Sequence, residues 1–131
     1  MGSSLGGFYA TALAEHLGCP AVVLNPAVDP ARGLQRYVGA QTAYHDPGVH
    51  FEFKAEYIDE LRALTPAALT RPARYAAVIA KGDELLDWRE MSQRYEGAQI
   101  RLLEGGDHAL SDFEQHLPFV LDFLHLLPAT R

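Results

Sequence analysis

Residues 1–7 read Met1-Gly2-Ser3-Ser4-Leu5-Gly6-Gly7, and this opening stretch indicates the fold more strongly than any other part of the chain. It contains the pattern Gly-x-Ser-x-Gly, a sharp turn that follows a strand, begins a helix and exposes a serine hydroxyl. Only Ser4 fits the central position, because Ser3 would require a glycine where Met1 stands. The backbone at such a serine is strained, and side chains two residues before and after it would collide, so we expect both flanking glycines to be needed. Gly7 should let the helix pack closely on the sheet.

Two later stretches place a carboxylate and an imidazole shortly after strands. The apolar run Ala76–Ala80 predicts a buried strand, and Asp83 follows it. A second strand-like run, Ile100–Leu103, precedes His108. In nucleophilic acyl transfer an imidazole activates a hydroxyl, and a carboxylate orients the imidazole. Ser4, Asp83 and His108 are therefore a candidate catalytic set.

The order of these residues along the chain is that of the α/β-hydrolases, which carry Ser, then Asp or Glu, then His, each on a loop after a strand. The stretches GSSLGGFYA, VVLNPAV, KGDELLDWRE and EGGDHALSDFE resemble the YqiA-like group of small bacterial esterases within that fold. The resemblance runs from Met1 to about Leu127, and the step Asn25-Pro26-Ala27 after a strand is one of its narrower features. It implies an α/β fold, namely the C-terminal part of an α/β-hydrolase with three layers and a mainly parallel sheet.

The resemblance also implies a reaction. Ser4 would be the nucleophile, Asp83 the triad acid and His108 the general base, and the backbone N–H of Leu5 would belong to the oxyanion hole. The expected function is hydrolysis of short- to medium-chain carboxylic esters or thioesters through an acyl-enzyme. The expected partner is this small-molecule substrate, and neither a cofactor nor a metal is needed.

Members of the group begin with a further segment before the nucleophile turn, and a loop of that segment supplies the second oxyanion donor. We therefore expect the chain to be N-terminally truncated relative to the group, marginally stable, and prone to self-association through an exposed sheet edge. Loss of one oxyanion donor costs about 100- to 1000-fold in turnover. Two alternatives stay open: a catalytically impaired remnant with a binding or structural role, and a perhydrolase or lyase that uses the same three residues.

The candidate acid has competitors and a structural alternative. Asp83 could merely cap its turn. Glu84 and Asp87 are rival acids on the same loop, although Asp87 also suits the N-cap of the following helix. Asp107, beside the candidate base, is expected to be solvated, because an adjacent residue rarely orients its neighbour's ring.

The histidines also need separate consideration. A solvated loop residue is the alternative for His108. We expect His16, His116 and His125 to lie on helices, at the surface or the edge of the core. His45 and His50 match no metal-ligand spacing, so no metal site is expected.

Composition is that of a globular domain, with 48% hydrophobic and 21% charged residues, and 131 residues suffice for one domain or part of one. The net charge of −6 without a basic cluster argues against a nucleic acid or an anionic membrane as partner. No apolar run approaches the roughly 20 residues of a membrane span. Cys19 is the single cysteine, which excludes an intrachain disulfide, so we expect a cytoplasmic protein.

The pattern predicts alternating helices and strands in a single partial domain over residues 1–131, with a cap at about residues 25–70. The expected elements are a helix over Leu5–Leu17 ended by Gly18, a strand at Ala21–Leu24, a short helix at Leu34–Val38, a helix within Phe51–Leu64, a helix at Trp88–Tyr95, and a last helix at Asp112–His125 begun by a capping box at Ser111–Glu114. An apolar-leaning face of the first helix comprises Leu5, Phe8, Ala12, Leu13, His16 and Leu17, and one face of the middle helix carries Tyr57, Leu61 and Leu64. In the last helix, the stripe expected to face the sheet comprises Phe113, Leu117, Val120, Leu121 and Leu124.

Overall fold

The computed structural model describes residues 1–43 and 45–127, which form two compact units. The larger unit comprises Met1–Val28 and the chain from Pro66 onward, and the smaller one comprises Asp29–Thr65. The larger unit holds a parallel sheet with the strand order β1-β2-β5-β6, so the expected α/β fold is confirmed. The strands are β1 (Gly2–Ser3), β2 (Ala21–Leu24), β5 (Tyr75–Ala80) and β6 (Gln99–Leu103).

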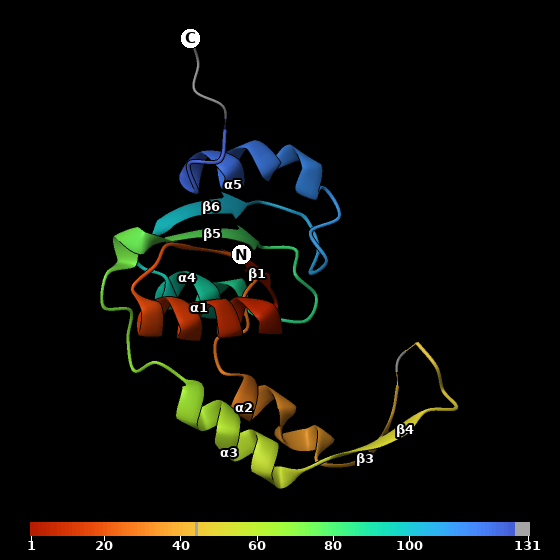
Figure 1. The fold of residues 1–131 in the computed structure, drawn as a ribbon. Helices are drawn as coiled ribbons and strands as arrows, with labels where there is room; N and C mark the ends of the chain where they lie inside the picture. Colours follow the sequence, from red (N-terminus) through yellow and green to blue (C-terminus); the bar gives the residue numbers. More distant parts are fainter. Residues whose placement is uncertain (44, 128–131) are drawn as a thin grey trace. The chain divides into compact units, whose positions relative to one another are not determined.

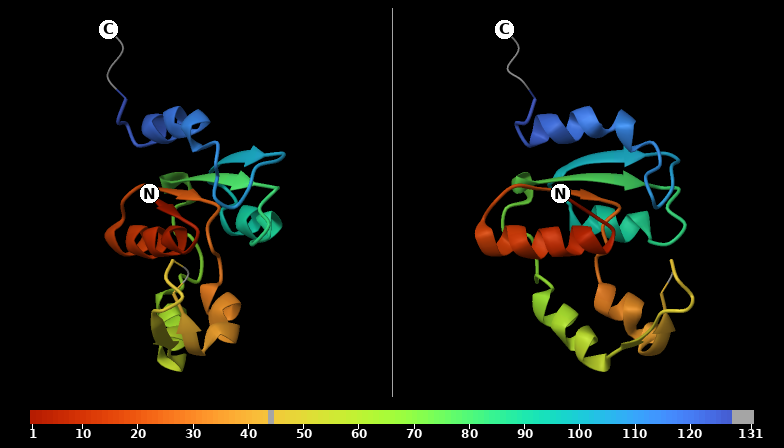
Figure 2. Two further views of the ribbon diagram at one scale, coloured as in Figure 1. Left: turned by 90° about the vertical axis from the view of Figure 1, so that its right-hand side faces the viewer. Right: turned by 45° about the vertical axis from the view of Figure 1, so that its right-hand side comes forward.

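Helices cover both faces of this sheet and give the expected three layers (Figure 1; Figure 2). The helices α1 (Leu5–Leu17) and α4 (Trp88–Arg94) lie on one face, and α5 (Leu117–Phe123) lies on the other. Alternate strand residues point to opposite faces. In β2, Val23 therefore packs in the core beneath α1 and α4, whereas Val22 packs in the core beneath α5.

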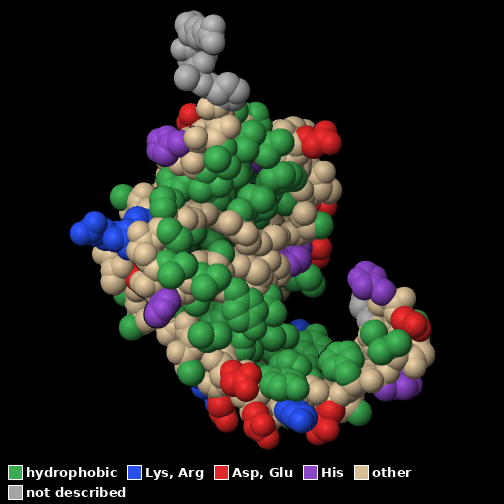
Figure 3. Space-filling model, viewed as in Figure 1, with side chains coloured by type: hydrophobic (Ala, Val, Ile, Leu, Met, Phe, Trp, Pro, Cys, Tyr) green, Lys and Arg blue, Asp and Glu red, His purple; other side chains and the backbone are tan. Residues whose placement is uncertain are grey.

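The first helix has the predicted bounds but buries a different face. Its C-terminus is Gly18 in the left-handed conformation, as expected. The buried residues are Gly7, Phe8, Thr11 and Ala14. Leu13 and Leu17, which belong to the apolar-leaning face, are 58% and 67% exposed, and apolar side chains are visible over this helix in Figure 3. Small residues one turn apart let the helix backbone approach the sheet, and that close approach decides the buried face.

The last helix is shorter than predicted, because it is broken in two. A 3-10 turn, η3 (Phe113–Gln115), precedes α5, and Pro118 lies in the first turn of α5. Proline has no N–H and clashes with the preceding turn, so it begins a helix more readily than it continues one. The predicted capping box at Ser111 does not form, since its hydroxyl donates to the Asp107 carboxylate instead. Val120 is buried as expected, whereas Leu117 is exposed.

The smaller unit contains the helices α2 (Pro30–Leu34) and α3 (Ala55–Leu64), the 3-10 turn η1 (Gln35–Tyr37) and a hairpin of β3 (Gly39–Thr42) with β4 (His50–Phe53). The helix predicted at Leu34–Val38 is wrong in position and begins a turn earlier. Asp29 caps its start by accepting a hydrogen bond from the Arg32 N–H at 3.2 Å, and Pro30 occupies its first turn.

The antiparallel hairpin is not among the predicted elements. His50–Phe53 does alternate polar and aromatic residues, but part of it falls within the range Phe51–Leu64 that is assigned to a helix. In α3, the buried residues are Ile58 and Leu61. Tyr57 and Leu64, which share the predicted face with Leu61, are exposed. A further 3-10 turn, η2 (Pro72–Arg74), leads into β5 of the larger unit. None of the helices in residues 1–43 and 45–127 combines the length and apolar character that crossing a membrane requires.

Candidate active site

Three side chains meet at the carboxyl ends of parallel strands of the same sheet. Ser4 follows β1, Asp83 lies on the loop after β5, and His108 lies on the loop after β6. The Ser4 hydroxyl oxygen is 2.9 Å from His108 Nε2, and His108 Nδ1 is 2.7 Å from Asp83 Oδ2. Both distances lie within hydrogen-bond reach. The structure therefore brings together the three residues that the sequence singled out.

The backbone at Ser4 has the conformation expected of a strained turn. Its φ of 55° and ψ of −122° are unusual for a residue with a side chain. The Ser4 N–H donates to the Leu24 carbonyl of β2 at 3.0 Å, and the Ser4 carbonyl accepts from the N–H groups of Gly7 and Ala27, each at 2.9 Å. Hydrogen bonds on both sides of the residue therefore hold the strained conformation and present the hydroxyl to His108.

The three glycines around this serine are not equally required. A methyl group on Gly2 would collide with the carbonyl of Gly6, so the first glycine is needed as expected. A methyl group on Gly7 would lie 2.9 Å from the Pro26 side chain, which confirms its role in close packing. A methyl group on Gly6 would meet none of the surrounding described atoms within 4 Å. The expectation that the second glycine of the pattern is sterically required is therefore wrong for these residues.

Asp83 caps its turn and also faces the imidazole, so the capping interpretation and the interpretation as the partner of His108 are compatible. Its Oδ1 accepts hydrogen bonds from the N–H groups of Leu85 and Leu86, each at 2.8 Å, which leaves Oδ2 for His108. The Asp83 side chain is 0% exposed and that of His108 is 17% exposed. Because a carboxylate only accepts hydrogen bonds, Nδ1 of His108 carries the proton and Nε2 is free to accept one from Ser4.

The rival acids bind other groups. Glu84 Oε2 accepts from the backbone N–H of His108 at 3.0 Å and does not meet the ring. Asp87 accepts from the Arg89 N–H at 2.9 Å as the N-cap of α4, as its position suggested. Among the acids considered, Asp83 alone is placed against the imidazole.

The loop that carries His108 is held by groups that the sequence did not reveal. Asp107 is half-buried rather than fully solvated, and it accepts from both the hydroxyl and the N–H of Ser111; these bonds lower the pKa of its carboxyl group. Asn25, which is buried, donates its side-chain amide to the carbonyls of Asp107 and His108. The sequence signals for Asn25 are its place directly after a strand and its part in the Asn25-Pro26-Ala27 step; neither predicts these contacts.

The first turn of α1 supplies the candidate oxyanion donor. The N–H of Leu5 is at the helix N-terminus, where N–H groups have no intrahelical carbonyl to bind. The positive end of the helix dipole also favours a developing negative charge there. The arrangement therefore places a hydroxyl, an imidazole and a backbone N–H at the same end of the sheet.

The other histidines of the larger unit lie apart from this site. His116 is buried, with Arg101 Nε donating to its Nδ1 at 3.1 Å and Asp112 Oδ2 at 2.9 Å from its Nε2, so it links β6 to the start of α5. His16 and His125 are exposed. Within the described residues, no group of three His, Cys, Asp or Glu side chains could hold a metal ion.

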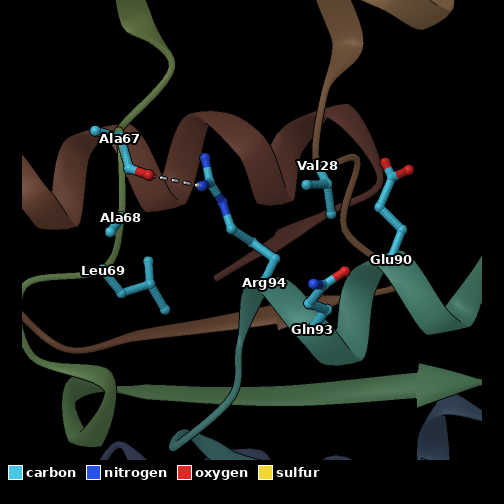
Figure 4. A pocket seen from close by; sticks show the side chains of 7 residues that line it. All are labelled: Val28, Ala67, Ala68, Leu69, Glu90, Gln93 and Arg94. Carbon is cyan, nitrogen blue, oxygen red and sulfur yellow. Dashed lines mark hydrogen bonds between the residues drawn. The ribbon is translucent and has the colours of Figure 1, made fainter.

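A pocket of about 330 Å³ lies beside α4, and Figure 4 shows the seven residues that line it. The guanidinium of Arg94 donates to the carbonyl of Pro66 at 2.6 Å and to that of Ala67 at 3.4 Å. None of Ser4, Asp83 and His108 lines this pocket. Through these bonds Arg94 ties α4 to the start of the segment that leads to β5.

Several solved structures have a fold similar to that of this chain. The chain matches the alpha/beta hydrolase domain-containing protein 10 from mouse with 18% identity and a TM-score of 0.65, covering 97% of this chain and 61% of that one. It matches the esterase domain of a Rhodothermus marinus protein with 19% identity and a TM-score of 0.61, covering 95% and 57%. It also matches Est1E from Butyrivibrio proteoclasticus with 13% identity and a TM-score of 0.60, covering 95% and 60%. The chain thus spans about six-tenths of the length of these structures, and at such identities the likeness shows the α/β-hydrolase fold.

The sequence itself matches one family over nearly its full length. The match extends over residues 1–125 and includes all three residues of the candidate site. This protein therefore belongs to the family described as "Uncharacterised protein family (UPF0227)", the YqiA-like group that its sequence resembles.

Proposed function

We propose that this protein is a serine hydrolase that cleaves short- to medium-chain carboxylic esters or thioesters. The observation that carries the proposal is the continuous hydrogen-bonded chain from Asp83 through His108 to Ser4, with the hydroxyl presented on a strained turn. Two of the structural relatives are named as an esterase domain and as a hydrolase-domain protein, which favours ester chemistry over other uses of the same site.

In the proposed first step, His108 Nε2 takes the proton of the Ser4 hydroxyl while Oγ attacks the acyl carbon. Asp83 Oδ2 holds Nδ1–H and stabilises the imidazolium that forms. The N–H of Leu5 donates to the developing oxyanion. The imidazolium then protonates the leaving alkoxide or thiolate, which leaves an acyl group on Ser4.

In the second step, His108 takes a proton from water as the water attacks the acyl carbon, and the returned proton releases Ser4. None of these steps requires a group beyond the named residues and water. We further propose that the smaller unit, Asp29–Thr65, serves as the cap of the substrate site, since it is inserted directly after the Asn25-Pro26-Ala27 step that borders Ser4.

A fluorophosphonate probe tests the proposal, because it forms a covalent bond with a serine only when a base activates the hydroxyl. We expect one adduct, located by peptide mass spectrometry on Ser4. The neighbouring Ser3 gives a matched control: Ser3→Ala should keep the label and Ser4→Ala should lose it. Equal labelling of the Ser4→Ala variant and the parent would contradict the proposal.

A further inference from the structure

Asn25 is a buried side chain whose hydrogen-bonding groups reach two different loops. It follows β2 directly, is 0% exposed and has a φ of 40°. Its Oδ1 accepts from the backbone N–H of Ala80 at 2.8 Å. Its Nδ2 donates to the carbonyl of Asp107 at 2.9 Å and to that of His108 at 3.1 Å. Both amide hydrogens and the amide oxygen are therefore used.

These bonds connect the three parts of the candidate site. Ala80 ends β5, and its carbonyl accepts from the N–H of Asp83 at 3.2 Å. Leu24, directly before Asn25, accepts from the N–H of Ser4 at 3.0 Å. The Asn25 amide itself holds the backbone of His108. One side chain thus lies between the backbone supports of the proposed nucleophile, acid and base.

Asparagine is the residue type that this position requires. The carbonyls of Asp107 and His108 need two N–H donors, and the Ala80 N–H needs an acceptor. A single side-chain amide supplies both. Asparagine also tolerates a positive φ better than most side chains. Aspartate has the same shape but no donor, so its carboxylate would face two carbonyl oxygens without a hydrogen bond.

We propose that Asn25 is a positioning residue that sets the distance between the His108 ring and the side chains of Ser4 and Asp83. It acts through the backbone of the His108 loop and touches no reacting atom. Its effect on turnover rests on the proposed serine hydrolase function, whereas its effect on the geometry of His108 does not.

The test compares Asn25→Asp with Tyr95→Phe. Tyr95→Phe is the control. It also deletes a buried hydrogen-bonding group, since the Tyr95 hydroxyl lies 2.8 Å from Thr11 Oγ1, but Tyr95 lies outside the candidate site. A misplacement of about 1 Å costs on the order of 100-fold in rate, so we expect Asn25→Asp to lower kcat by about 10- to 100-fold with little change in KM. Tyr95→Phe should leave kcat unchanged, and thermal melts compare the stability of the two variants.

A second measurement uses proton NMR of the His108 Nδ1–H that bonds Asp83. We expect this signal to be retained in the parent and in Tyr95→Phe, and to be lost or broadened in Asn25→Asp. Asn25→Asp with parental kcat and a retained signal overturns the proposal. The proposal is also overturned if Asn25→Asp and Tyr95→Phe lose the same stability and show the same loss of kcat. If Ser4→Ala hydrolyses ester as fast as the parent, the hydrolase function fails, and the NMR comparison still decides the positioning role.

A third test uses the parent protein alone, so it does not depend on whether a variant folds. Asn25 is the only asparagine in the chain, so labelling with ¹⁵N-asparagine yields one side-chain amide pair. Slow hydrogen exchange of this pair, together with through-bond coupling to the carbonyls of Asp107 and His108, is expected. Exchange as fast as in the denatured chain overturns the proposal.

Discussion

Replacement of Asp83 by asparagine separates the proposed acid from its neighbour Glu84. The Asp83 Oδ1 accepts two backbone N–H bonds at 2.8 Å, so an asparagine there keeps its oxygen on Leu85 and Leu86. Its NH₂ group then faces His108 Nδ1 and can only donate to it. Nδ1 must become the acceptor, Nε2 carries the proton, and the ring can no longer take a proton from Ser4.

This change of tautomer sets the size of the effect. The corresponding substitution in a Ser-His-Asp triad lowers kcat by about 10⁴-fold, which corresponds to about 5 kcal/mol of transition-state stabilisation. Glu84→Gln is the matched control, because Glu84 is exposed and accepts the backbone N–H of His108 rather than a hydrogen bond from its ring. The glutamine keeps an oxygen that can accept this bond, so we expect a loss below about 1 kcal/mol, or about fivefold in rate.

The assay is kcat/KM for a p-nitrophenyl ester, with circular dichroism and thermal melts to show that each variant folds. Asp83→Asn should retain the parental fold and lose nearly all turnover, and Glu84→Gln should resemble the parent. Equal losses in the two variants, or an Asp83→Asn rate within about tenfold of the parent's, would refute the assignment of the acid.

Two further predictions concern stability. Gly6→Ala should leave the free energy of unfolding unchanged or raise it by up to about 1 kcal/mol, because Ala is the better helix residue. Gly2→Ala should lower the free energy of unfolding, because its methyl group would collide with the Gly6 carbonyl. Equal effects of the two substitutions in urea titrations would show that the turn is packed differently. Burial, followed by the hydrogen bond to Glu15, raises the pKa of Tyr75 above its ordinary value of 10.0. Above about pH 10 the unfolded tyrosine therefore ionises first, and the free energy of unfolding falls with rising pH. Tyr75→Phe should make this fall less steep, and identical slopes in the two proteins would contradict the role of Tyr75.

Local signals in the sequence were sufficient for elements bounded by strong markers. Gly18 ends α1 where predicted, and the apolar runs that form β2 and β5 have no competing periodicity. The three proposed catalytic residues were found because each follows a strand and the order of their side-chain types is restrictive. The structure adds the distances that join them.

The buried faces and the long excursion depend on tertiary contacts that a local pattern does not contain. The close approach of Gly7 to Pro26 turns Leu13 and Leu17 of α1 outward, although both are apolar. Pro118 divides a stripe that reads as one continuous helix. The sequence marks Asn25 only as part of the Asn25-Pro26-Ala27 step and does not reveal its contacts, because its partners Ala80, Asp107 and His108 are more than 50 residues away.

The central claim is that the Ser4 hydroxyl attacks an ester, and hydrolysis by the parent and by Ser4→Ala tests it most directly. Both proteins are assayed side by side with a p-nitrophenyl ester under conditions in which their thermal transitions coincide. The account predicts measurable hydrolysis by the parent and a rate for Ser4→Ala at or near the uncatalysed background. An unchanged rate in Ser4→Ala would contradict the account, because the hydrogen-bonded chain from Asp83 to Ser4 would then have no part in the reaction.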